Sequence, residues 1–395
     1  MRKKMIAASA VLALSFQTAA FAADPIKLGF LSVDSGPFMN VMEHFTDPAR
    51  LAVEVLNAEG GALGRKFELA MQAHSGTPAT AIAAANKLVE QQGVSMFSGF
   101  FTSSMSAALA PRLAGMNVLM FDADTTSDDS IGKNCTANFF HTSGTNKMVS
   151  NVIQSVVKKS GIKTWNVIAS DYSMGHGFAE QLAPLFKAEG GSVKAQVFVP
   201  LGTSDFGSAI STLAASPAEG LAVAVTGVDS INFFKQQKQF GLLAKYKTVI
   251  SSSSSVNDAV LDAMGDSSVG VYLANQWDKS IPGEGNAAFV KAYQARYKKM
   301  PTFMDADVFQ AFQLMRDGIV KAKSTDVAAV RAALSGMKTN TVFGPVEVRA
   351  ADHQVLRPMA LQQVVAQGEG KAAIALRGVV PASEVTPPVS PDCKL

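Results

Sequence analysis

Short apolar runs alternate with segments whose apolar residues recur at helical spacing, and this alternation limits the fold more than any other feature of the chain. In the first part of the chain, the runs typical of buried strands are at 26–33, 67–73, 94–100 and 117–123. Strands that alternate with helices form a parallel sheet with helices on both faces. Asp47-Pro48 and Thr77-Pro78 are predicted helix starts, because Asp and Thr cap helices and Pro suits the first helical position.

The same rhythm restarts near Gly144 and then changes. Strand-like runs follow at 165–171, 193–199, 221–226, 248–252 and 269–274, and helical patterns at 285–299, 303–323 and 325–335. The runs 346–349 and 359–365 are interpreted as a β-hairpin pair ahead of a proline-rich tail. Two similar α/β halves, followed by helices that belong to neither half in sequence order, predict two lobes built from discontinuous segments.

The first 22 residues have the layout of a secretory signal. Arg2, Lys3 and Lys4 give a basic start, a short apolar run follows, and the A-F-A run at 20–22 has the small-x-small pattern of a cleavage site. The apolar run is too short to span a bilayer. We therefore predict cleavage after Ala22 and a mature protein free in an extracytoplasmic space, with a membrane anchor as the alternative.

The composition of the mature chain argues against a nucleic-acid partner. The full chain has a formal net charge of +3, and the predicted signal removes three basic residues and no acidic ones, which leaves a net charge of zero. A neutral surface offers no electrostatic footprint for nucleic acid. Apolar residues make up 48% of the chain, which is ample for the cores of two domains, and no later run is long and apolar enough for a transmembrane helix.

The chain has two cysteines, Cys135 and Cys393. In an oxidising compartment a lone pair of cysteines usually forms one bridge, so we predict a Cys135–Cys393 disulfide that ties down the proline-rich tail. Two free thiols are the alternative. Neither a Cys-x-x-Cys motif nor a pair of His residues at metal-ligand spacing occurs in the sequence, and we predict no metal site.

Catalytic and cofactor signatures are absent from the sequence. It contains no Gly-x-Ser-x-Gly elbow, no P-loop and no His-Glu-x-x-His motif. Gly175-His-Gly177 begins like a dinucleotide fingerprint, but Glu180 stands where the third Gly belongs, so we interpret it as a helix start. We therefore predict a protein that is not an enzyme and has no cofactor.

Polar loops follow several of the predicted strands, in both halves of the chain. They are the segments at 34–38, 101–104, 122–126 and 251–255, together with Asp171-Tyr172 and Asp229. Ligands of open α/β sheets bind at the carboxyl ends of the strands. Hydroxyls at the start of a helix, as at 102–104, suit a carboxylate, although the same residues suit an ordinary N-cap. Each loop alone fits a solvated turn, whereas the joint pattern predicts a ligand site.

Eight short runs carry a resemblance to a known family, in order and over nearly the whole mature chain. They are IKLGF at 26–30, SGP at 35–37, EVLNAEGG at 54–61, LGR at 63–65, KLVEQ at 87–91, GTSDF at 202–206, FVKAYQARY at 289–297 and FGP at 343–345. In these runs the chain resembles the type I periplasmic solute-binding proteins of ABC importers, in the branched-chain amino acid (Leu/Ile/Val-binding) group.

The resemblance implies an α/β fold of two Rossmann-like lobes with parallel sheets, joined by a three-crossover hinge that closes on a ligand. With the restart of the pattern near Gly144, it predicts a first lobe of residues 26–143 and 276–349 and a second lobe of residues 144–275 and 350–395. It implies a monomeric periplasmic protein. This protein would capture a small polar ligand, either an amino acid or an aromatic or other small carboxylate, and deliver it to the permease of an ABC importer in the inner membrane.

The resemblance also implies which residues bind the ligand. They are Ser35, Phe38, Phe101, Thr102, Ser103, Asp124, Thr125, Tyr172 and Asp229. In the family, hydroxyls and N–H groups of the first half hold the ligand carboxylate, which points to Thr102, Ser103 and Thr125. An acid after a strand of the second half grips the amino group, and Asp229 stands there.

Some residues depart from the pattern of the family. Met174 stands where the family often has Tyr, Asp124 where amino-acid binders have a small residue, and Phe100 in place of Pro. These departures argue against an ordinary leucine-type ligand. Aromatic residues in the loops, Phe38 and Tyr172 among them, suit a flat or bulky ligand, while a core position is the alternative for the Phe residues.

Three further alternatives remain open at this point. Because Asp122 and Asp124 would repel a carboxylate, a ligand with two positive groups and no acid is one alternative within the binding class. A secreted α/β hydrolase is another, and it requires an activated nucleophile with a base in reach, which no motif in the sequence supplies. The sensing domain of a receptor is the third, and it requires a transmembrane segment.

Overall fold

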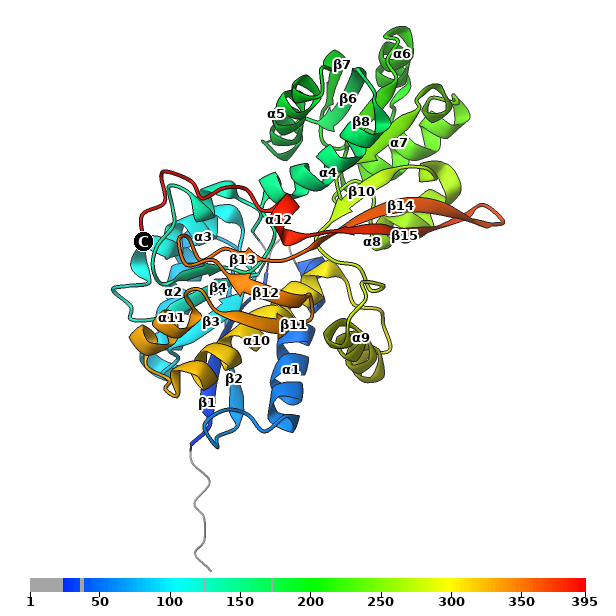
Figure 1. Cartoon of the computed structure of the whole chain (residues 1–395). Coiled ribbons are helices and arrows are strands. Elements are labelled where there is room, and N and C mark those ends of the chain that lie inside the picture. Colours follow the sequence, from blue (N-terminus) through cyan, green and yellow to red (C-terminus); the bar gives the residue numbers. More distant parts are fainter. Residues whose placement is uncertain (1–23, 36–38, 124, 172) are drawn as a thin grey trace, which may run out of the picture.

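The structure is a computed structural model that describes residues 24–35, 39–123, 125–171 and 173–395. Two lobes are evident, each with a sheet covered by helices (Figure 1). The α/β architecture with parallel sheets predicted from the sequence is confirmed. In the part of the chain that is described, no helix combines the length and the apolar character needed to cross a membrane.

The first lobe contains a parallel sheet of five strands in the order β2-β1-β3-β4-β5. Its strands are β1 (Ile26–Val33), β2 (Phe67–His74), β3 (Met96–Gly99), β4 (Leu119–Asp122) and β5 (Phe139–His141). The first four are at the predicted places. The sequence analysis missed β5, because three residues carry too little periodicity to be recognised as a strand.

The helices of the first lobe come from two separate stretches of the chain. They are α1 (Glu43–Ala58), α2 (Pro78–Gln92), α3 (Ser103–Leu109), α9 (Glu284–Tyr297), α10 (Phe303–Ala322) and α11 (Val327–Leu334). One hydrophobic core joins residues of β1, such as Phe30, to residues of α10, such as Phe312, whose ring centroids are 6.3 Å apart. The late helices, which start at Glu284, therefore complete the core of a lobe whose first strand starts at Ile26.

The two predicted helix starts had different outcomes. At Thr77 the side chain accepts a hydrogen bond from the N–H of Thr80, and Pro78 is the first residue of α2, as predicted. The start at Asp47-Pro48 was wrong, since α1 begins at Glu43 and Pro48 lies inside it. Pro48 has no N–H and so removes one bond of the helical ladder, while the turn before it is held by the N–H groups of Phe45 and Thr46, which donate to the Met42 carbonyl.

The second lobe contains a sheet of seven strands in the order β15-β14-β10-β9-β8-β6-β7. The strands are β6 (Thr164–Ser170), β7 (Ser192–Val199), β8 (Gly220–Ala224), β9 (Thr248–Ser251), β10 (Tyr272–Asn275), β14 (Met359–Gly368) and β15 (Lys371–Val380). The helices are α4 (Asn146–Ser160), α5 (Ser173–Ala188), α6 (Gly207–Ala215), α7 (Gly227–Gln239), α8 (Asp258–Met264) and α12 (Ala382–Val385). The neighbours among β6, β7, β8, β9 and β10 pair in parallel, while β14 pairs antiparallel with both β10 and β15.

The hairpin predicted from the runs 346–349 and 359–365 was wrong, because each run pairs elsewhere. β12 (Gly344–Val348) pairs with β11 (Lys338–Thr341) and β13 (Val355–Leu356), whereas β14 pairs with β10 and β15. The sequence KTNT of β11 has no apolar alternation, so it gave no strand signal. The turn from β14 to β15 has positive φ angles at Gly368, Glu369 and Gly370, which is the backbone of a tight hairpin.

The chain passes between the two sheets three times: after β5, after β10 and between β13 and β14. On the third passage, Val355 packs in the core of the first lobe and Met359 in the core of the second. The division of the chain at 143/144, 275/276 and 349/350 stays a prediction. The predicted Cys135–Cys393 disulfide is present in the structure, with 5.5 Å between the two Cα atoms.

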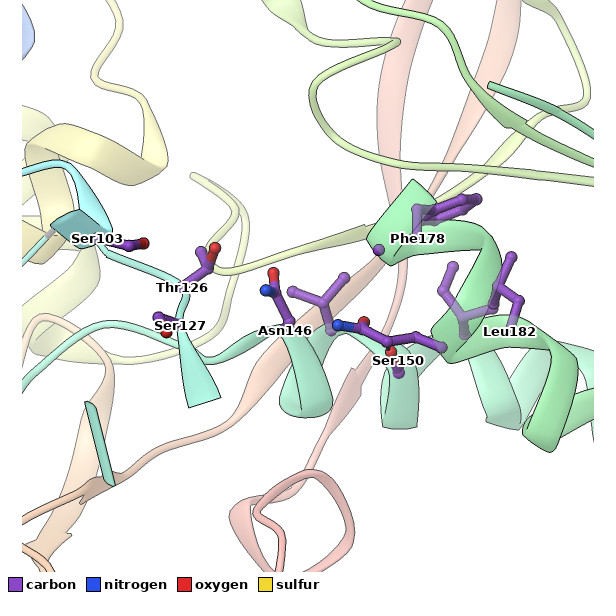
Figure 2. Close-up of a pocket in the computed structure, with 11 residues that line it drawn as sticks. Ser103, Thr126, Ser127, Asn146, Ser150, Phe178 and Leu182 are labelled. Atoms are coloured by element: carbon purple, nitrogen blue, oxygen red, sulfur yellow. Dashed lines mark hydrogen bonds between the residues drawn. The ribbon is translucent and has the colours of Figure 1, made fainter. Parts of the chain in front are cut away.

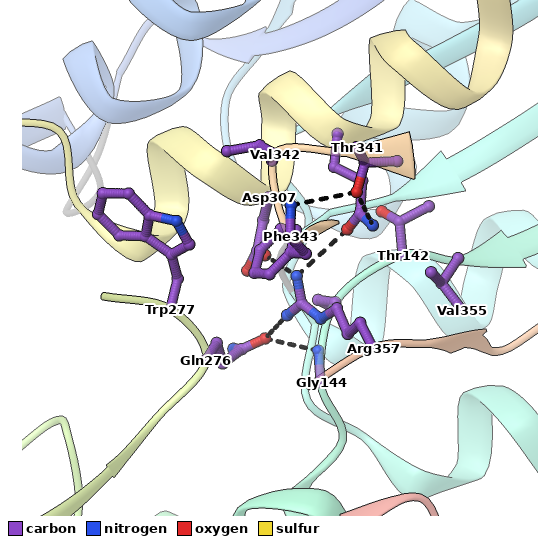
Figure 3. A network of polar contacts seen from close by, with 12 residues as sticks. Thr142, Gly144, Gln276, Trp277, Asp307, Thr341, Val342, Phe343, Val355 and Arg357 are labelled. Carbon is purple, nitrogen blue, oxygen red and sulfur yellow. Dashed lines mark hydrogen bonds and ion pairs between the residues drawn. The ribbon is translucent and has the colours of Figure 1, made fainter. Parts of the chain in front are cut away.

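A buried arginine joins the three passages (Figure 3). Arg357, on the third passage, is fully buried and forms an ion pair with Asp307 of α10. Its Nη2 donates to Oε1 of Gln276 on the second passage, at 2.5 Å, and the same oxygen accepts from the N–H of Gly144 on the first, also at 2.5 Å. The guanidinium lies 4.0 Å from the ring centroid of Phe343, a favourable cation–π geometry.

Candidate ligand-binding cleft

A cavity of 310 Å³ lies between the two lobes (Figure 2). It is lined by Ser103, Thr126, Ser127, Asn146, Val149, Ser150, Ile153, Gly177, Phe178, Gln181 and Leu182. The residues at 103 and 126–127 follow β3 and β4, and those of α5 follow β6, so the carboxyl ends of strands from both sheets meet here. This is the edge at which open α/β sheets bind ligands.

The cavity has a polar wall and a largely apolar wall. In Figure 2, Ser103, Thr126 and Ser127 stand on the side of the first lobe, and Phe178 and Leu182 on the helix α5 opposite. None of the described lining residues has a charged side chain. Hydroxyl and amide groups can fix the polar end of a small molecule, while an apolar wall covers its body.

Hydrogen bonds between the loops hold this polar wall in place. The N–H of Asn146 donates to the carbonyl of Thr126 at 2.7 Å, and Ser143 Oγ donates to the carbonyl of Thr125 at 2.7 Å. Thr145 caps α4 through the N–H of Met148. The first passage between the lobes is therefore fastened to the loop after β4, and it carries Asn146 into the cavity.

Asp122, at the end of β4, is turned into the first lobe. It is fully buried, and its oxygens accept hydrogen bonds from Ser106 Oγ at 2.5 Å, from the N–H of Thr125 at 3.1 Å and from Thr125 Oγ1 at 2.7 Å. A hydroxyl has one hydrogen to donate, so the Thr125 hydroxyl offers only lone pairs to any further partner in this conformation. Asp122 thus organises the loop from within the lobe.

The remaining predicted residues of the first lobe differ in exposure. Ser103 is exposed and lines the cavity. Thr102 caps α3 through the N–H of Met105 and its hydroxyl lies 2.9 Å from that of Ser104. Phe101 is fully buried, with its ring centroid 6.2 Å from that of Phe97, so it belongs to the core. Ser35 is exposed and bonds to Asp34.

In the second lobe, Asp229 lies in the first turn of α7 and is mostly buried. Its Oδ2 accepts a hydrogen bond from the N–H of Gly202 at 2.8 Å. It lines neither this cavity nor the one described next. The predicted ligand contacts Phe38, Asp124 and Tyr172 lie outside the described residues.

A second cavity, of 530 Å³, opens between the lobes near the second passage. The first lobe contributes an apolar wall of Val41, Trp277, Phe303 and Met304, together with His44. The second lobe contributes residues after β8 and β9, which include Gly227, Ser253, Ser254 and Asn257. The two cavities therefore bring together loops from both sheets at two places in the cleft between the lobes.

His44, at the edge of the second cavity, forms a pair with a buried acid. Its Nδ1 lies 2.9 Å from Oδ2 of Asp305, which also accepts from the N–H and the hydroxyl of Thr302. The hydrogen bond to Asp305 raises the pKa of the His44 imidazole above its ordinary value. In the part of the chain that is described, no group of three His, Cys, Asp or Glu side chains is placed to hold a metal ion.

The sequence analysis missed several residues of the two cavities. Asn146, Ser150 and Gln181 of the first cavity lie on helices, whereas the polar pattern in the sequence pointed only to loops after strands. Trp277 is the second residue after the predicted lobe boundary at 275/276, so the sequence pattern could have placed it at the cleft. His44 carried no local signal, because its partner Asp305 is 261 residues away.

Comparisons with known proteins agree with this architecture. The profile of the family described as "Periplasmic binding protein" matches residues 25–369. "Leu/Ile/Val-binding protein homolog 6" of Brucella melitensis is 24% identical over 374 residues, which cover 93% of this chain and 94% of the relative.

Two solved structures have the same fold over almost the whole chain. An amino acid ABC transporter substrate-binding protein from Pseudomonas fluorescens Pf-5 is 25% identical, with a TM-score of 0.81 and coverage of 95% of this chain and 100% of that one. An ABC transporter solute-binding protein from R. palustris in complex with benzoate is 21% identical, with a TM-score of 0.76 and coverage of 94% and 100%. With a family profile matched from residue 25 to residue 369, the chain belongs to the periplasmic binding protein family.

Proposed function

We propose that this chain captures a small polar ligand between its two lobes and delivers it to the permease of an ABC importer. The protein acts in the periplasm as a binding protein without catalytic activity, after removal of residues 1–22. The observation that carries the proposal is the uncharged cavity of 310 Å³ whose walls come from both lobes. Its volume is within the range of small-molecule sites, and a ligand that touches both walls favours the closed arrangement of the lobes.

The lining of this cavity indicates the chemistry of the ligand. Ser103, Thr126 and Asn146 can donate hydrogen bonds to a carboxylate, and Phe178 and Leu182 suit a ring or an alkyl chain. Among the described lining residues there is no carboxylate to meet an amine. This favours an aromatic or other small carboxylate over an amino acid. The two solved structures of similar fold, one named for amino acids and one with benzoate, bracket these classes.

Asp229 tests the amino-acid alternative. Its Oδ2 already accepts the N–H of Gly202, and a ligand amine would use a remaining lone pair of the carboxylate. If Asp229→Ala leaves the affinity intact while Ser103→Ala weakens it, the ligand is a plain acid. An equal loss in both variants indicates a ligand with an amine. Unchanged affinity in both variants would show that the contacts taken from the family are wrong.

We expect Ser103→Ala to weaken ligand binding about tenfold or more, because a hydrogen bond to a charged group contributes roughly 1.5–3 kcal/mol. A thermal-shift screen of amino acids, aromatic acids, amides and small cations identifies the compound, and titration calorimetry measures the affinity. Ser104→Ala is the matched control, since Ser104 is also exposed at the start of α3 but does not line the cavity. Equal affinities of the two variants would contradict the placement of the ligand at Ser103.

A secreted α/β hydrolase is the competing function, and it differs in one measurable respect. A hydrolase converts the compound that it binds, whereas a binding protein releases it unchanged. The family profile and the similar folds belong to binding proteins. Product formation from any compound of the screen, at a rate proportional to the amount of protein, would favour the hydrolase.

A further inference from the structure

The last ten residues of the chain, 386–395, run from the second lobe back to the first. They leave α12 beside α4 and end beside the loop that contains Cys135 (Figure 1). We call this segment the strap. It is separate from the three passages through which the chain connects the two sheets.

The strap is anchored at its start in the second lobe. Val385, the last residue of α12, is fully buried in the core that also contains Val152 and Trp165. The carbonyl of Val385 accepts a hydrogen bond from Asn151 Nδ2 of α4 at 2.8 Å. A buried side chain and a side-chain amide therefore fix this end against the second lobe.

The strap is anchored in the first lobe at two points, one near its start and one near its end. Arg349, which follows β12, donates from Nη1 to the carbonyl of Pro387 at 2.7 Å and is itself paired with Asp352. Cys393 is bonded to Cys135, between β4 and β5. Of these anchors only the disulfide is covalent, so it is the one that keeps the strap attached to the first lobe when the lobes separate.

The strap is short and stiff between these anchors. Cys393 lies eight residues after Val385, a length that spans roughly 26–29 Å when fully extended. Three of these residues are prolines, at 387, 388 and 391, and proline restricts the backbone. Part of the strap borders a cavity of 710 Å³ that is also lined by residues of α4 and α5. Tight packing against these helices therefore does not hold this part in place.

We propose that the Cys135–Cys393 disulfide closes the strap into a fourth covalent connection between the lobes, which limits how far they separate in the ligand-free protein. A tether of fixed length removes the most open arrangements from the ensemble. A ligand that binds the closed arrangement then costs the protein less conformational entropy, because the most open arrangements are already absent. The strap therefore raises the affinity of the cleft without touching the ligand.

The test compares the wild type with a Cys135→Ser/Cys393→Ser variant by single-molecule energy transfer. The dyes are attached through unnatural amino acids at Lys87 of α2 and Lys235 of α7, which are exposed positions in the two lobes. We expect a broader distribution of distances in the variant, shifted toward greater separation, and an affinity a few-fold weaker for the compound found by the screen. Val389→Ala, a change within the strap that keeps the bridge, is the control and is expected to match the wild type.

Reduction of the folded wild type with a dithiol gives the same comparison without a substitution. It should reproduce the distribution of the double variant, and the reductant should have no effect on the double variant itself. An unchanged distance distribution after the bridge is cut, shown by mass spectrometry to be complete, would overturn the proposal. The distances are measured without ligand, so this outcome is independent of whether the proposed function holds.

Discussion

Replacing Arg357 with methionine is expected to lower the free energy of unfolding by about 3–5 kcal/mol, because it leaves the carboxylate of Asp307 buried without its partner. Both side chains are almost completely buried. Arg357 also donates to Gln276, which holds the N–H of Gly144, so the same change loosens the contact among all three passages. Urea denaturation of the wild type and the variant measures the loss.

The partner acid provides the control for this prediction. Burial raises the pKa of the Asp307 carboxyl to about 6, against the opposing effect of Arg357. Arg357→Met removes the opposing effect, so Asp307 in the variant is expected to take up a proton. Adding Asp307→Leu removes the buried acid and should recover part of the lost stability. If the single variant were as stable as the wild type, Arg357 would not be a structural link at the hinge.

An exposed ion pair provides a control that tests whether the loss of stability in Arg357→Met comes from burial. Arg296 and Glu54 form a pair whose side chains are each half exposed. Surface pairs of this kind contribute little, and Arg296→Met should leave the denaturation midpoint nearly unchanged. A loss of similar size in both variants would mean that removing any arginine from this fold is costly, which would contradict the role assigned to Arg357.

Asp122→Ala is expected to lower the free energy of unfolding by about 3–5 kcal/mol and to weaken ligand binding more than Ser103→Ala does. Among the described residues, the change removes the acceptor of three donors, two on Thr125 and one on Ser106, and each buried donor left unsatisfied costs roughly 1–3 kcal/mol. Because Thr125 precedes two residues that line the cavity, the loss also loosens the polar wall. Denaturation and calorimetry measure the two effects.

The local mechanism behind the Asp122 prediction has its own readout. Hydrogen exchange of the Thr125 N–H should be faster in Asp122→Ala than in the wild type, since that group loses its bond to Oδ1. Asp122→Asn keeps one acceptor oxygen of similar shape and should lie between the two. Unchanged exchange at Thr125 in the alanine variant would show that Asp122 does not organise this loop.

Local patterns predicted much of the fold. The apolar run at 26–33 is β1 to the residue, and the cap at Thr77 forms as expected. These features depend on neighbours in sequence, so a single chain reveals them. The pairing of β12 and β14 was predicted wrongly, because strand partners are chosen across the whole molecule. The start of α1 was also wrong, because the helix begins at Glu43 and continues through Pro48, a residue that ordinarily marks a helix start.

The candidate site was only partly within reach of the sequence. Ser103 lines the cavity, whereas Phe101, two residues earlier in the same loop, belongs to the core. Which residue of a short loop faces a cleft depends on the helix that follows, and the sequence pattern does not reveal it. The link between Arg357 and Asp307 spans 50 residues of sequence. In the sequence, Arg357 is a basic residue before a proline, a pattern that is typical of an exposed loop.

The central claim is that the cleft between the lobes captures one small solute and releases it unchanged. Titration calorimetry with the best compound of the thermal-shift screen, followed by NMR of the recovered compound, tests this claim most directly. We expect saturation at one ligand per chain, an intact compound after prolonged incubation, and a higher affinity for the wild type than for Ser103→Ala. Conversion of the compound to a product, or saturable binding that is the same in Ser103→Ala, Asp122→Ala and the wild type, would contradict it.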